Sequence, residues 1–146
     1  MQENNRTVEF LNKVYKNAQM GEESITFLSE KIEDPMLMSD LQCQHKEYTD
    51  ISDKAVDALS QQQALPQKQN PLSQIGLFAG VQMNTITDKS PNKIAEMIIQ
   101  GSMMGVIDMT RTLKEYSDTP TNVQKIGQDL IKLEENSIQK MKQYLS

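Results

Sequence analysis

Five polar residues fall on or beside the apolar lines of predicted helices: Glu22, Gln44, His45, Glu134 and Ser137. Three of them are of types that bind metal ions. Glu22, His45 and Glu134 together offer two carboxylates and one imidazole. These groups suit a divalent ion such as Fe, Zn or Mn. A polar side chain that replaces an apolar one must otherwise be solvated or hydrogen-bonded, because burying it unpaired is costly. Glu22, His45 and Glu134 are therefore candidate metal ligands. The alternative, which we favour, is a hydrogen-bonded pair of Glu22 with His45, or a Glu22 that reaches water.

The elements that must position these residues are helices with marked starts. Asp34-Pro35, Ser90-Pro91 and Thr119-Pro120 each place a capping side chain directly before proline. The cap oxygen accepts from a free N–H group of the first turn, and proline at the first helical position sacrifices no hydrogen bond. With the apolar periodicity, these signals predict four helices. They cover about residues 5–33, 35–63, 91–116 and 120–145.

Apolar residues recur along these segments at alternating three- and four-residue spacing, which is the seam pattern of helix bundles. Within the third segment, Gly101 and Gly105 predict a close helix–helix approach. Of the methionines there, Met97, Met103, Met104 and Met109, a core position is the favoured interpretation, and partner binding stays open. The seam residues are Val8, Leu11, Tyr15, Ala18, Ile25 and Ile32; Leu37, Leu41, Tyr48, Ile51, Ala55 and Ala58; Ile94, Met97 and Ile98; and Val123, Leu130, Met141 and Tyr144.

The connections between the predicted helices differ in length, and this decides the topology. The turns near residues 33–34 and 117–118 are short, so each must join an antiparallel hairpin. Residues 64–90 are too many for a hairpin turn and long enough to run the length of a helix. Their apolar stretch, residues 75–81, is expected to pack on the bundle. The prediction is one all-α domain, residues 1–146, an antiparallel four-helix bundle of two hairpins joined by one long crossover.

Counting residues from the predicted turns indicates which candidate ligands lie at one depth. Glu22 and His45 come out level on the first hairpin. Glu134 on the second hairpin comes out level with residues 100–102, where Gly101 lies on the seam and supplies no ligand. Asp108 lies too close to its turn to be a partner of Glu134.

Composition narrows the classes of function. The formal net charge is −5 and the basic residues are scattered, which argues against a nucleic-acid partner. The chain has no apolar stretch long enough for a membrane span and no apolar segment typical of a secretion signal near Met1. Cys43 is the single cysteine, so an intrachain disulfide is impossible and a reducing cytoplasm is expected. We expect Cys43 to be a small packing residue.

Layout and spacing resemble the ferritin-like superfamily. More specifically, residues 17–25 (NAQMGEESI), 90–108 (SPNKIAEMIIQGSMMGVID) and 134–145 (EENSIQKMKQYL) resemble an uncharacterised group of small Firmicutes-type bundle proteins. For that group, association with spores would be an analogy only.

The di-iron members of the superfamily use a glutamate on one helix and Glu-x-x-His on its partner, twice over. By this resemblance Glu22 and Glu134 match glutamates. His45 and Tyr48 stand where the motif has Glu and His, and Ser137 stands where it has the second His. Two ligands of six match, so the resemblance does not imply di-iron chemistry.

These observations predict a non-catalytic helical bundle, either structural or a protein-interaction module, without a cofactor. Its partner would be a second copy of the chain, forming a homodimer, or another protein. The alternative is a degenerate ferritin-like protein that binds one divalent metal through Glu22, His45 and Glu134.

Overall fold

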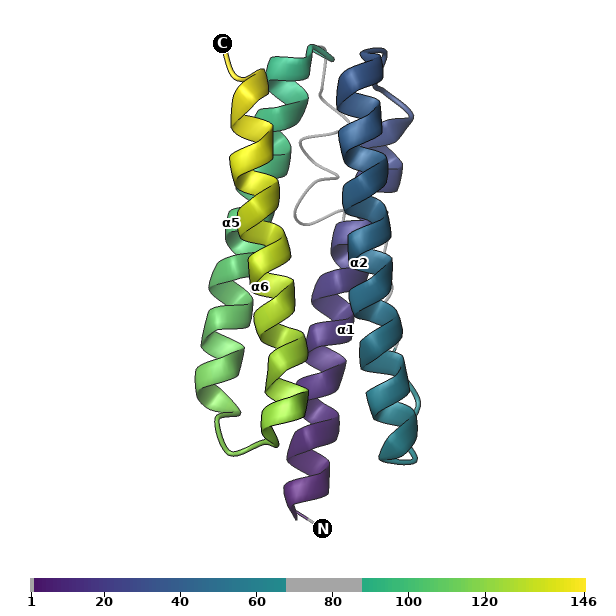
Figure 1. Ribbon diagram of the computed structural model, residues 1–146, viewed down its shortest axis with the longest axis vertical. Coiled ribbons are helices and arrows are strands. Elements are labelled where there is room, and N and C mark those ends of the chain that lie inside the picture. The colour runs from purple at the N-terminus through teal and green to yellow at the C-terminus, as the bar shows by residue number, and fades with distance from the viewer. Residues whose placement is uncertain (1, 68–87) are drawn as a thin grey trace.

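The computed structural model describes residues 2–67 and 88–146, and the side chains from residue 4 onward within those ranges. It consists of four long helices packed side by side, which confirms the all-α four-helix prediction (Figure 1). Most of the predicted crossover, including residues 75–81, lies outside the described residues. The helices are α1 (Gln2–Ser29), α2 (Pro35–Gln61), α5 (Pro91–Glu115) and α6 (Thr121–Met141), followed by the short 3-10 helix η2 (Lys142–Tyr144).

The four helices form two antiparallel hairpins, α1–α2 and α5–α6. α5 packs beside α1, and α6 packs beside α2. α2 and α5 run in the same direction, so the end of α2 and the start of α5 lie at opposite ends of the bundle (Figure 1). The two ends that the connection must join are thus a bundle length apart, as the predicted topology requires. None of the described helices is long and apolar enough to cross a membrane.

Two of the three predicted caps form. The Asp34 carboxylate accepts from the backbone N–H of Leu37 at 2.8 Å, and the Ser90 hydroxyl accepts from that of Lys93 at 3.2 Å. The predicted Thr119 cap is wrong. α6 begins one residue later than Pro120, which itself takes the cap position without a side-chain hydrogen bond. The Thr119 hydroxyl instead donates to the Tyr116 carbonyl at 2.6 Å, and that carbonyl also accepts from the Thr119 backbone N–H at 3.1 Å.

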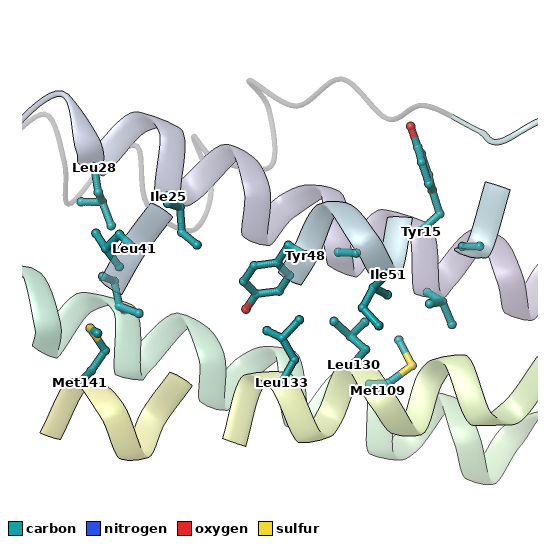
Figure 2. Packing of buried hydrophobic residues seen from close by; sticks show 14 of the residues in the cluster. Tyr15, Ile25, Leu28, Leu41, Tyr48, Ile51, Met109, Leu130, Leu133 and Met141 are labelled. Carbon is teal, nitrogen blue, oxygen red and sulfur yellow. The ribbon is translucent and has the colours of Figure 1, made fainter. Parts of the chain in front are cut away.

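The core lies where the four apolar seams meet, as Figure 2 shows for Leu41, Ile51, Leu130 and Met141. Most predicted seam residues are buried. Phe10, Val14 and Leu28 are also buried, because a core-facing helix buries a stripe wider than one 3,4 line. Cys43, expected to pack inside, is exposed.

The two hairpins are also joined at the surface near their ends. The Arg6 side chain donates to the Asp118 carboxylate at 2.7 Å and to the Glu115 carbonyl at 2.6 Å, and it lies over the Tyr116 ring. These contacts join the start of α1 to the turn between α5 and α6. At the other end, Asp40 of α2 accepts hydrogen bonds from Gln143 and Tyr144.

Removing the Asp34 cap tests how much a helix start contributes. Asp34→Ala leaves the Leu37 N–H without its acceptor, so we expect the free energy of unfolding to fall by about 1 kcal/mol. Urea denaturation followed by circular dichroism measures the change. Ser39→Ala, at an exposed site in the same helix, is the matched control and should change stability by much less. Equal losses in the two variants would contradict the cap assignment.

A buried polar layer between the helices

A carboxylate and a phenol meet in the middle of the bundle. Glu134 of α6 is 3% exposed and Tyr48 of α2 is 4% exposed. The Tyr48 hydroxyl donates to Glu134 Oε2 at 3.3 Å, which is long for a hydrogen bond between two oxygens. Figure 2 shows the Tyr48 ring among the core side chains, with its hydroxyl directed toward the α5–α6 side. The second oxygen, Glu134 Oε1, is buried without a hydrogen-bond partner.

Three further polar side chains extend this contact along the bundle. The Ser137 hydroxyl of α6 donates to Gln44 Oε1 of α2 at 2.9 Å. The Ser102 hydroxyl of α5 donates to Ser137 Oγ at 3.4 Å, and it also lowers the pKa of the neighbouring Tyr48. All three are buried, and the Nε2 atom of Gln44 has no partner. We call Gln44, Tyr48, Ser102, Glu134 and Ser137 the polar layer.

Two glycines make the space that the large members of the polar layer occupy. A Cβ atom on Gly21 of α1 would lie 2.4 Å from the Tyr48 ring. A Cβ atom on Gly105 of α5 would lie 1.9 Å from Glu134 Oε2. The Asn17 side chain of α1 donates to the Gly105 carbonyl at 3.1 Å, so α1, α5 and α6 meet at this glycine. The close approach predicted for Gly105 is therefore an approach of a side chain to a helix backbone.

Burial controls the protonation of the pair. The pKa of Glu134 is raised from 4.5 to about 8. Loss of water is the largest cause, the Tyr48 hydrogen bond opposes it, and the nearby Asp108 carboxylate adds to the rise. Burial, reinforced by the Glu134 charge, raises the pKa of Tyr48 well above its ordinary value. At neutral pH, Glu134 is therefore mainly the neutral acid and Tyr48 remains a hydroxyl donor.

The candidate ligands Glu22 and His45 lie outside this layer. The Glu22 carboxylate accepts from the Ser52 hydroxyl at 2.7 Å, not from His45. His45 is half-buried, and its backbone carbonyl accepts from Thr49 at 3.0 Å. The expected Glu22–His45 hydrogen bond is thus replaced by a Glu22–Ser52 bond further along α2.

The predicted depths of Glu22 and Glu134 were counted from Cα positions, and both carboxylates lie nearer the N-terminus of their own helix than that count predicted. Helical side chains lean toward the N-terminus of their own helix. In an antiparallel hairpin, Glu22 therefore leans away from the turn while His45 leans toward it, and the two diverge. Likewise, Glu134 leans toward the α5–α6 turn and meets Gly105 instead of the predicted Gly101.

The geometry gives the single-metal hypothesis no set of ligands. Within the described residues, no group of three or more His, Cys, Asp and Glu side chains is placed to hold a metal ion. Glu134 is hydrogen-bonded to Tyr48 and Glu22 to Ser52, and neither a phenol nor a serine hydroxyl is a strong ligand for such an ion. Metal binding through Glu22, His45 and Glu134 stays a prediction without support from this arrangement.

The sequence alone pointed to part of the layer. Gln44, Glu134 and Ser137 stood out as polar residues on apolar seams, and the layer contains all three. Gly21 and Ser52 were missed. Gly21 carried a usable signal, since a glycine inside a long helix lowers helix propensity and needs a packing reason.

Adding a methyl group at Gly105 tests the contact with Glu134. Gly105→Ala should lower the free energy of unfolding by about 1–3 kcal/mol, since the new Cβ forces the carboxylate to move. In a Glu134→Ala background the clash is absent, and the same substitution should be neutral or stabilising because alanine favours helix. Urea unfolding of the four proteins gives the coupling energy. Additive effects would show that Glu134 does not rest on Gly105.

The raised pKa of Glu134 makes stability depend on pH. Between pH 4.5 and about 8 the unfolded chain loses this proton while the folded chain keeps it, so stability falls as pH rises. The slope from this one group is at most about 1.4 kcal/mol per pH unit, and it disappears above pH 8. Glu134→Gln keeps the shape without the titration. The wild type should therefore lose stability relative to Glu134→Gln as the pH rises from 5 to 8, so the unfolding free energy of the variant minus that of the wild type should increase. A constant difference would contradict the shift.

Comparisons with protein-family models, curated proteins and solved structures found no significant match.

Proposed function

We propose that this chain is a non-catalytic helical scaffold that binds another protein molecule through the outer surface of α5. The buried position of its ionisable pair supports a structural role. A catalytic acid must lie within hydrogen-bond reach of its substrate. Glu134 and Tyr48 are among the least exposed residues of the described chain, and each is already placed against the other.

The observation that carries the binding proposal is an apolar cluster on the solvent side of α5. Met103, Met104 and Ile107 are 51%, 54% and 49% exposed. Single exposed apolar residues are ordinary, but neighbouring ones mark interaction sites. We call these three residues the α5 face. Met97 and Met109 of the same helix are buried, so the predicted methionine stripe divides between core and surface.

Among the residues that the structure describes, the other exposed large apolar side chains stand apart from this cluster. Met36 lies at the start of α2, Leu65 follows its end, and Leu145 lies next to the C-terminus. Each stands at the end of an element, where exposure is common. The α5 face is different because it lies midway along a helix that α1 and α6 hold from the other side.

The polar layer supports the α5 face from behind. Gly105 lies between Met104 and Ile107 in the sequence, and its backbone contacts Glu134 and Asn17. Contacts from two other helices therefore fix α5 at the level of the exposed cluster. A fixed surface loses little conformational freedom on binding, which favours association.

Photo-cross-linking in the source cells tests this proposal. With benzoylphenylalanine at position 103, we expect a discrete adduct with a protein. The same residue at position 132, an exposed lysine site on α6, is the matched control and should give much less. Mass spectrometry of the adduct distinguishes a second copy from another protein. Equal or absent cross-linking at the two positions would contradict a binding role for α5.

A further inference from the structure

The stripe of α5 that carries Met103 and Ile107 has an acidic side chain toward its start and a basic one toward its end. Helical residues advance by about 100° each, so Glu96, Met103, Ile107 and Lys114 share one stripe about 40° wide. Lys93 and Arg111 both lie beside that stripe, one near each end. Glu96 is toward the start of α5, whereas Arg111 and Lys114 are near its end. All of these side chains reach solvent. The stripe therefore runs from acidic through apolar to basic.

Resting on the proposed function, we infer that the partner of the α5 face is a second copy of this chain, packed with its α5 antiparallel to the first. A stripe with opposite charges at its ends is complementary to an identical stripe that runs in the opposite direction. A two-fold axis near the middle of the α5 face brings the apolar clusters of both copies together. It also brings the acidic end of each stripe beside the basic end of the other.

The register follows from the position of the apolar residues. Suppose that Met104 of one copy lies level with Ile107 of the other. Glu96 of the first copy then lies level with position 115 of the second, one residue away from Lys114. Arg111 then lies level with Gln100 of the second copy. The like-charged Glu115 is about a third of a turn away from the stripe and points to its side. If the two α5 helices were parallel, Arg111 and Lys114 of one chain would face the same two residues of the second chain. The repulsion between these like charges would oppose pairing.

Glu96 is available for this contact even though it has a neighbour. Within one chain the Lys93 ammonium lies 3.3 Å from the Glu96 carboxylate, one turn away on the helix. Both side chains are more than two-fifths exposed. Exposed pairs of this kind contribute little to stability, so Glu96 can turn to a lysine of the second copy at small cost.

The size of the surface predicts the strength of association. Stable dimers commonly bury about 800 Å² on each partner. One stripe along the middle of a single helix is smaller than this. We therefore expect a reversible dimer whose fraction rises with concentration.

Sedimentation equilibrium over a concentration series measures the dissociation constant. Ile107→Lys places a charge beside the two-fold axis and should weaken dimerisation by at least about tenfold. Met36→Lys introduces the same charge at another exposed apolar residue, outside the stripe, and is the matched control. Circular dichroism confirms that both variants stay helical. A dimer that Ile107→Lys leaves intact would overturn the proposal.

Charge reversal tests the antiparallel register. Glu96→Lys alone and Lys114→Glu alone each place like charges together at two symmetric contacts. Each should weaken the dimer about fivefold at low salt. Combining Glu96→Lys with Lys114→Glu restores opposite charges and should recover most of the affinity. Losses that simply add in the double variant would overturn the register.

The outcomes separate this inference from the proposed function. If the purified protein is a monomer at all concentrations and position 103 captures a different protein, the dimer is wrong and the interaction role stands. If position 103 gives no adduct with any protein, both fall. An adduct within one chain, between position 103 and residues 68–87, would also overturn both.

Discussion

The arrangement of the bundle depends on placing two large polar side chains, Tyr48 and Glu134, in its centre. Neither fits against an ordinary helix surface, because each occupies the space of a missing side chain at Gly21 or Gly105. Sliding one helix past another by a turn would drive a ring or a carboxylate into side-chain atoms. An apolar seam tolerates such slips more easily, since one aliphatic contact resembles another. The pair therefore selects one register for α1, α2, α5 and α6 together.

This selectivity has a cost that protonation reduces. A buried charge without a counter-ion is strongly unfavourable, and the long Tyr48 hydrogen bond offsets little of that penalty. Keeping the proton on Glu134 at neutral pH removes the charge. What remains is two buried polar atoms without partners, Glu134 Oε1 and Gln44 Nε2. The centre of the bundle is accordingly less stable than an aliphatic core of equal volume would be, but it is more specific.

The fold was predictable because local signals and apolar periodicity agreed over most of the chain. Prolines after Asp34 and Ser90 marked helix starts, and short turns fixed the hairpins. The third helix start was misjudged because Thr119 can bond backward to Tyr116 as well as forward. In the polar layer, the sequence identified Gln44, Glu134 and Ser137 but not their partners. The partner of a side chain depends on where its polar end lies. Counting Cα positions ignores the tilt of helical side chains toward the N-terminus, and this tilt brings Glu22 to Ser52 and Glu134 to Gly105.

The same geometry separates two ways in which a glutamate can persist in a helical core. A metal-binding glutamate needs further strong ligands at one point and must be ionised, so its surroundings should favour the charge. Glu134 has the opposite surroundings: a phenol donor, a glycine backbone and a nearby Asp108 carboxylate, with a pKa raised mainly by burial. Such an environment suits a neutral acid that fills space and fixes register. Because Gly105, which receives this acid, also belongs to the turn that presents Met104, the inner contact and the outer α5 face share one short stretch of helix.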